Sequence, residues 1–89
     1  MARVRFTANL ERHIAAPTSE APGDTVRAAL DNVFQANPPL RGYIVDERGA
    51  LRKHMLIFIN GEQIADREKL SDKVKAADEI FVLQALSGG

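Results

Sequence analysis

Cysteine and tryptophan are absent from this 89-residue chain, and its charges cancel. Without cysteine the chain can form no disulfide framework, no thiolate metal site and no cysteine nucleophile. Twelve basic and twelve acidic residues give a formal net charge of zero. This balance argues against nucleic acid or an anionic membrane as the partner. We therefore expect protein partners, and a fold that depends on packing alone.

Long apolar runs are absent too. No stretch approaches the ~20 apolar residues of a membrane span, and Met1 is not followed by the apolar segment of a signal peptide. We therefore expect a cytoplasmic protein. A chain of this length forms one domain with a single core. We place the domain at residues 1–86 and a flexible Ser-Gly-Gly tail at residues 87–89.

Alternating residues predict strands near both ends of the chain. Val4 and Phe6 fall on one face of a strand at residues 2–7, and residues 80–85 alternate in the same way. Residues 16–21 predict a weaker strand. Because Pro17 cannot donate a ladder hydrogen bond, this strand should lie at a sheet edge.

A single long helix is expected at about residues 25–36. Its apolar residues recur with helical spacing at Val26, Ala29, Leu30, Val33 and Phe34. Thr25 suits the N-cap, and Pro38-Pro39 cannot continue the helix. After it, we expect a short extended piece at residues 43–45 and a turn at residues 46–49.

The most apolar run, residues 55–59, predicts a strand that stops at Asn60-Gly61, a strong hairpin signal. Residues 63–65 would form the short return strand. Residues 66–77 are expected to form a loop or helical turn, with Leu70 and Val74 as its apolar anchors.

This order of elements predicts an α+β fold, in which one main helix packs on one face of a mixed sheet. The connections allow the first and last strands to lie side by side and parallel. That arrangement is the β-grasp, or ubiquitin-like, architecture.

Three segments resemble the MoaD/ThiS family of ubiquitin-like sulfur carriers: residues 56–62, 78–80 and 85–89. The resemblance covers essentially the whole chain. It implies a C-terminal glycine that a ubiquitin-activating-type enzyme adenylates with ATP and that is then converted to a thiocarboxylate. By position Gly89 would be the modified residue. The residues threaded into the partner would be Leu86, Ser87 and Gly88.

The chemistry of such a tail agrees with this resemblance. Glycine has no β-carbon, so a carboxylate on Gly88-Gly89 can enter a narrow active site. A carboxylate is ionised at pH 7 and is a poor acyl donor until it is activated. The chain has no glycine-rich phosphate loop, so we expect no bound cofactor, and ATP and Mg²⁺ would be used by the partner. The protein would be a co-substrate rather than an enzyme.

The implied partners are the adenylating enzyme, a sulfur donor and a downstream sulfur-accepting synthase. Residues 51–54 are similar to the branch of the family that serves cysteine or secondary-metabolite synthesis. The alternative function is a ubiquitin-like modifier, in which activated Gly89 is transferred to a lysine of a target protein. A more distant alternative is a plain interaction domain with an inert tail.

A second candidate site is apolar. If Val4 and Phe6 face the helix, the alternate residues of the third and last strands face away from it. These residues are Leu56, Phe58, Phe81 and Leu83. We expect them to form the surface on which the partner docks, because monomers seldom expose a large apolar patch without using it. The alternative is that the segment 40–54 covers them.

Other polar groups give weaker signals. His13 and His54 belong to no metal-binding motif, so we predict no metal site. The acidic pairs Asp46-Glu47 and Asp78-Glu79 are interpreted as solvated turn residues.

A local basic stretch is formed by Arg48, Arg52, Lys53 and His54. It would suit an acidic partner or a phosphate. The neutral charge of the whole chain favours an ordinary solvated surface instead.

Overall fold

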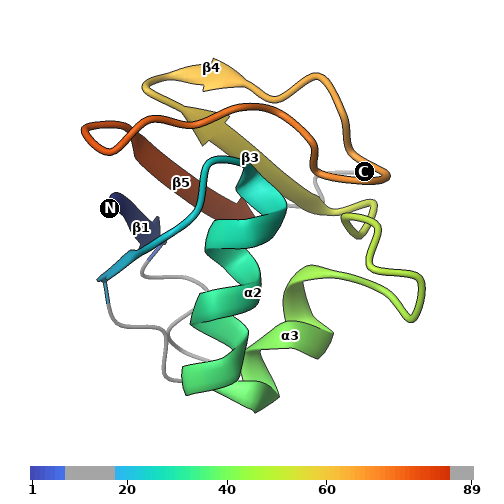
Figure 1. The fold of residues 1–89 in the computed structure, drawn as a ribbon. Helices are drawn as coiled ribbons and strands as arrows, with labels where there is room; N and C mark the ends of the chain where they lie inside the picture. The colour runs from blue at the N-terminus through green and yellow to red at the C-terminus, as the bar shows by residue number, and fades with distance from the viewer. Residues whose placement is uncertain (8–17, 85–89) are drawn as a thin grey trace.

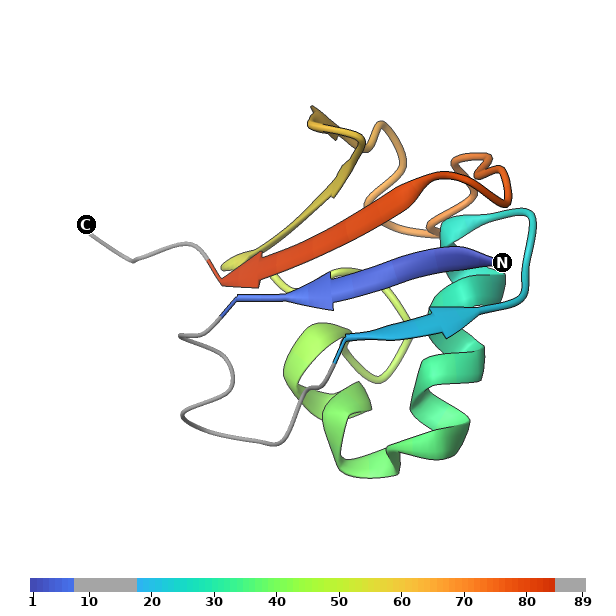
Figure 2. The same ribbon diagram turned by 90° about the vertical axis from the view of Figure 1, so that its left-hand side faces the viewer.

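A five-stranded mixed sheet carries two helices on one of its faces (Figures 1 and 2). The computed structural model describes residues 1–7 and 18–84. Its strands are β1 (Ala2–Phe6), β2 (Ser19–Ala21), β3 (Met55–Ile59), β4 (Glu62–Gln63) and β5 (Glu79–Gln84). Its helices are α2 (Val26–Ala36) and α3 (Pro38–Ile44). This is the predicted β-grasp architecture.

The strand order is β2-β1-β5-β3-β4. β1 and β5 lie parallel at the centre, with Val4 opposite Ile80 and Phe6 opposite Val82. β2 pairs antiparallel with the outer side of β1, so the prediction of an edge strand is confirmed, although Pro17 lies outside the described residues. The first and last strands are therefore neighbours, as the connections predicted.

Helix α2 forms where the sequence predicts it. The Thr25 hydroxyl accepts a hydrogen bond from the backbone N–H of Ala28 at 3.1 Å, which satisfies one of the unpaired donors at the N-terminus of the helix. All five apolar residues of the predicted stripe are buried. The helix ends at Ala36, and its C-cap Asn37 directly precedes Pro38.

Helix α3 corrects one prediction. Tyr43 and Ile44 were expected in an extended piece, but they form the last turn of this seven-residue helix, which lies beside the longer α2. Two prolines open α3, because the first helical positions need no backbone N–H donor. Leu40 and Ile44, four residues apart, turn to the core and are buried. Only Val45 is extended, and it pairs with Leu51.

The hairpin after β3 is confirmed. Asn60 and Gly61 have φ values of 50° and 89°, the left-handed conformation that a tight hairpin turn requires. The return strand is β4, which begins at Glu62 and ends at Gln63 rather than covering residues 63–65. Ile64 instead turns inward and is buried.

One cluster of buried side chains fills the space between the sheet and the helices. It takes residues from every described element except β4, among them Val4, Leu30, Leu40, Ile57 and Ile80. Leu70 and Val74 join it, so both anchors of the segment 66–77 are confirmed.

Asp66 holds this segment in shape. Its carboxylate accepts hydrogen bonds from the backbone N–H groups of Glu68 and Lys69 and from the hydroxyl of Ser71. These bonds, the one from Lys69 first, lower the pKa of Asp66 to about 2. Because they close the turn before Leu70, they place that side chain over the core.

Candidate functional site

The face of the sheet that α2 does not cover carries two apolar cross-strand pairs. Leu56 stands opposite Leu83, and Phe58 stands opposite Phe81. All four side chains are partly exposed. We call these four residues the open face. The placement agrees with the sequence prediction, while the docking role stays a prediction.

The inner face of the same two strands is buried. Met55, Ile57, Ile80 and Val82 each expose 1% of their surface or less. This contrast fixes the register, since a slip of one residue would exchange the buried set for the exposed one.

The segment 40–54 does not provide the predicted alternative cover. Leu40, Ile44 and Leu51 from this segment belong to the buried cluster beneath α2. Figure 2 shows α3 on the same side of the sheet as α2. The segment therefore packs on the face opposite to Phe58 and Phe81.

Arg5 is part of this surface and was not among the predicted site residues. It stands opposite Phe81 in the parallel β1–β5 register, and its guanidinium carbon lies 5.4 Å from the centre of the Phe81 ring. Its Nη1 lies 3.1 Å from Oε1 of Glu79. The predicted parallel pairing of the first and last strands was the signal in the sequence that could have placed Arg5 beside Phe81. The Arg5 cation therefore lies at the border of the open face, over the Phe81 ring.

The open face ends beside Gln84, the last described residue of the chain. Gln84, the last residue of β5, stands opposite Met55, the first residue of β3. Leu83 and Leu56 form the adjacent pair. The predicted tail residues Leu86, Ser87, Gly88 and Gly89 lie outside the described residues. A partner that binds the chain just beyond Gln84 would therefore be next to apolar side chains.

The far end of β5 is fixed by a polar network. The side-chain amide N–H of Asn60 donates to Oδ1 of Asp78 at 2.8 Å. The amide oxygen of Asn60 accepts a hydrogen bond from the backbone N–H of Glu79 at 2.9 Å. The Asp78 carboxylate also accepts from the backbone N–H of Lys75, which together with the Asn60 bond lowers the pKa of Asp78. Asp78 and Glu79 are therefore not the simply solvated turn residues that the sequence predicted. They bond the start of β5 to its neighbours.

Asp46 also departs from that prediction. Its Oδ1 accepts from the backbone N–H groups of Arg48 and Ala50, and these bonds, the one from Ala50 first, lower the pKa of Asp46. It closes the predicted turn at residues 46–49, while Glu47 is exposed. The carboxylates have structural roles in their turns.

The described part of the chain shows no other chemical centre. Residues 1–7 and 18–84 contain no group of three or more metal-ligating side chains. His54 is exposed, and His13 lies outside the described residues. No helix in these ranges is both long and apolar enough to cross a membrane.

A surface hollow of about 490 Å³ lies between β2 and the helices, lined in part by Ala21, Val33 and Leu40. β1 separates β2 from β5, so the hollow is remote from the end of β5. Among the described residues that line it, one side chain is ionisable, that of Glu20. We assign no chemistry to it.

Comparison with solved structures places this geometry among small ubiquitin-like proteins. A chain of the Amycolatopsis orientalis BexX/CysO complex superposes with a TM-score of 0.83 at 26% identity, and both chains are covered completely. SAMP1, the small archaeal modifier protein 1 from Methanosarcina acetivorans, gives 0.80 at 29% identity over 99% of this chain and 95% of its own. CysO from Mycobacterium tuberculosis gives 0.81 at 20% identity over 97% of this chain and 100% of its own, which supports the fold alone.

A comparison with curated proteins finds none that matches. The ThiS family profile matches residues 4–89, nearly the whole chain, including the two terminal glycines. The β-grasp topology, the similarity to CysO and SAMP1 and this match agree. The chain belongs to the ThiS family of ubiquitin-like proteins.

Proposed function

We propose that this protein is a sulfur carrier whose Gly89 carboxylate is adenylated and then converted to a thiocarboxylate. The carboxylate attacks the α-phosphorus of ATP and pyrophosphate leaves, which gives an acyl adenylate. A sulfide donor then attacks the acyl carbon and AMP leaves. The thiocarboxylate passes its sulfur to an acceptor in the biosynthesis of a cofactor, cysteine or a secondary metabolite.

The observation that carries this proposal is the match of the ThiS family through Gly89. The position of Gln84 supports it. β5 ends at Gln84, five residues before Gly89, and Gln84 pairs with Met55, the first residue of β3, which directly follows residues 52–54. Five extended residues span up to about 17 Å. This length allows Gly89 to enter an active site while the open face rests on the enzyme surface.

The catalytic groups belong to the partner in this proposal. A ubiquitin-activating-type enzyme provides the ATP site, Mg²⁺ and the cationic groups that stabilise phosphoryl transfer. The chain provides the carboxylate and the docking surface, and it acts as a co-substrate without a bound cofactor. Because adenylation consumes ATP, we place this function in the cytoplasm. A sulfur donor and a sulfur-accepting synthase complete the set of partners.

A ubiquitin-like modifier is the second candidate function. It is favoured by the similarity to SAMP1, a modifier protein by name, at 29% identity. Activation would be the same, but a lysine amine of a target protein would attack the acyl carbon in place of sulfide. The product would be an isopeptide bond to Gly89.

Intact-mass measurement distinguishes the two functions. The chain is incubated with the activating enzyme of its own organism, ATP and sodium sulfide. A carrier gains the mass difference between sulfur and oxygen, and fragmentation places the change at Gly89. A modifier recovered from its own cells instead forms adducts with the mass of a second protein. Modification of an internal side chain would contradict both functions.

A further inference from the structure

The basic stretch of the sequence lies at the same end of the sheet as the start of the tail. Gln84 closes β5 opposite Met55, which opens β3. Because β3 and β5 are antiparallel, the C-terminal end of β5 at Gln84 lies beside the residues that precede Met55. Arg52 and Lys53 are among these residues. A protein that receives the tail must therefore lie close to their charges.

The guanidinium groups at this place are oriented by backbone carbonyls. Nε of Arg52 donates to the carbonyl of Gly42 at 2.7 Å, and Nη2 of Arg67 donates to the carbonyl of Arg52 at 2.8 Å. Within the described ranges the one ion pair closer than 4.0 Å joins Arg5 and Glu79 on the other face. The two guanidiniums are thus held in position without a paired carboxylate, and their remaining N–H donors are available to an anion.

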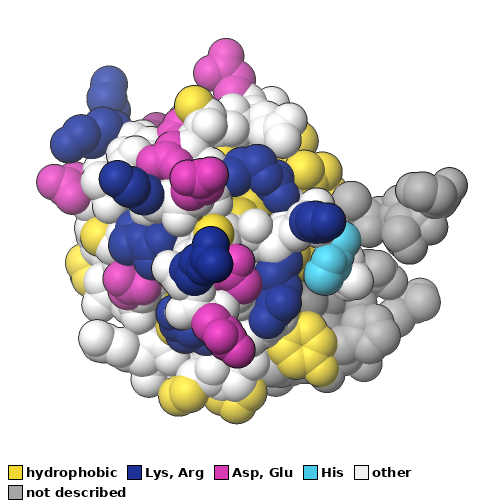
Figure 3. All heavy atoms as spheres, turned by 90° about the vertical axis from the view of Figure 1, so that its right-hand side faces the viewer, with side chains coloured by type: hydrophobic (Ala, Val, Ile, Leu, Met, Phe, Trp, Pro, Cys, Tyr) yellow, Lys and Arg dark blue, Asp and Glu magenta, His cyan; other side chains and the backbone are white. Residues whose placement is uncertain are grey.

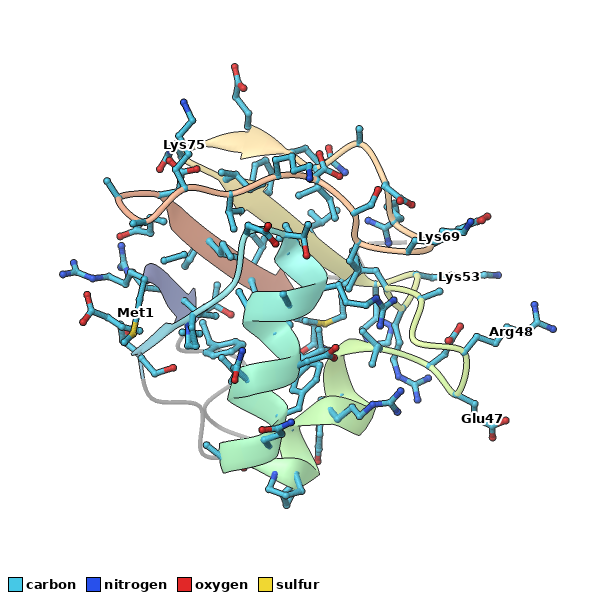
Figure 4. All side chains as sticks on the ribbon, viewed as in Figure 1. Met1, Glu47, Arg48, Lys53, Lys69 and Lys75 are labelled. Atoms are coloured by element: carbon cyan, nitrogen blue, oxygen red, sulfur yellow. The ribbon has the colours of Figure 1, made fainter. Side chains whose placement is uncertain are left out.

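Two more cations extend into solvent beside them. Lys53 and Arg48 project from the same side of the molecule, together with Lys69 and the carboxylate of Glu47, whereas Lys75 projects from another side (Figure 4). Figure 3 looks onto this side and shows Lys and Arg side chains gathered across it, with acidic side chains between them. Charged side chains of both signs therefore gather on this side of the neutral chain, and cations are prominent among them.

The nearest carboxylates offset this cluster only in part. The backbone N–H groups of its own turn, that of Ala50 first, and then the charges of Arg48 and Arg52 lower the pKa of Asp46, so this carboxylate interacts with both cations. Glu47 is exposed and makes no ion pair. A surface hollow of about 310 Å³ lies between Asp46 and the residues 51–54, which include two cations. Because Asp46 also lines this hollow, a carboxylate of a partner would bind on the side of Arg52 and Lys53.

We propose that Arg48, Arg52, Lys53 and Arg67, which we call the cationic patch, dock an acidic surface of the activating enzyme beside the point where the tail enters it. The inference rests on the proposed function, because it names the chemistry of the partner surface. Oriented guanidiniums favour carboxylates, which they bind through two parallel hydrogen bonds. The patch steers association, while the open face provides the apolar contact.

Charge reversal tests the patch. Lys53→Glu and Arg48→Glu change exposed side chains that make no side-chain hydrogen bond within the described chain, so both variants should stay folded by circular dichroism. At low salt each should slow association with the activating enzyme about fivefold, and the difference should fade at high salt. Glu47→Lys should speed association. Lys75→Glu, with the same charge change on another side, is the control and should alter the rate less than twofold.

Several results would overturn the patch. One is an equal effect of Lys53→Glu and Lys75→Glu. Another is an effect that salt does not change. A raised KM for ATP with an unchanged association rate would assign the patch to phosphate instead of carboxylate. If the enzyme never adenylates the unaltered chain, the proposed function fails. If the enzyme adenylates both the unaltered chain and Lys53→Glu, and associates with both at equal rates, the docking role of the patch is wrong while the proposed function stands.

Discussion

Phe58 and Phe81 stand opposite each other in the β3–β5 register, on the face of the sheet that the helices leave uncovered. One residue further along β5, Val82 stands opposite Ile57 on the buried face. Adjacent residues of one strand thus belong to a surface and to a core. This alternation lets substitution separate docking from folding.

We expect Leu83→Asp to stay folded and to bind the activating enzyme at least about tenfold more weakly. The introduced carboxylate is solvated in the free protein, but it must be desolvated when an apolar partner surface covers it. Val82→Asp should unfold the domain, because it buries an unpaired charge in a protein of modest stability. Circular dichroism and a binding titration measure both effects. A native Val82→Asp and an unfolded Leu83→Asp would move the docking surface to the other face.

Deletion of Gly88-Gly89 should abolish adenylation and leave the melting temperature within about 1 °C of the full chain. Both glycines lie beyond Gln84, the last residue of the sheet, so they add no ladder hydrogen bond to the described fold. Pyrophosphate exchange and thermal melts measure the two properties. Deletion of Met1, at the other end of the sequence, is the matched control and should leave adenylation intact. A truncated tail that is still adenylated would contradict the assignment of Gly89.

Phe34→Ala should lower the free energy of unfolding by about 3–5 kcal/mol, the usual cost of removing a buried phenylalanine. Phe34 exposes 7% of its surface and packs in the cluster between the sheet and the helices. The neighbouring Gln35 is exposed, so Gln35→Ala on the same helix is the control and should cost less than about 0.5 kcal/mol. Urea denaturation measures the difference. Similar costs for the two variants would mean that α2 does not anchor the core.

Stability should fall in acid partly through Asp66. Its pKa in the folded protein is about 2, below the ordinary value of 3.8, so its contribution is complete above pH 3.8 and is lost as pH falls through about 2. Asp66→Asn should be less stable at pH 7 and should depend less on pH in that window. Urea midpoints measured across it provide the test, with Glu68→Gln as the control, because the Glu68 side chain accepts none of these bonds. An unchanged pH dependence in Asp66→Asn would exclude this role.

Elements whose signals lie within a few neighbouring residues were predictable from the sequence. The cap at Thr25 and the apolar stripe of α2 define the helix because its hydrogen bonds and its buried face repeat within a few residues. Asn60-Gly61 defines the hairpin because both residues accept positive φ. The alternation of residues 80–83 also distinguishes the open face from the core, because successive side chains of a strand point to opposite faces. The terminal glycines are the basis of the proposed chemistry.

Features that depend on contacts between distant parts of the sequence became visible in the fold alone. Tyr43 and Ile44 are helical because the helix buries Leu40 and Ile44 against the core beside α2. The free energy gained by this burial outweighs the local preference of these residues for extended backbone. The place of Arg5 over Phe81 required the parallel pairing of strands more than seventy residues apart. The same holds for the cationic patch, since the sequence shows four cations but not that β5 ends beside them. Strand register, a long-range property, brings the basic stretch, the Leu56–Leu83 pair and Gln84, the last described residue, to one end of the sheet.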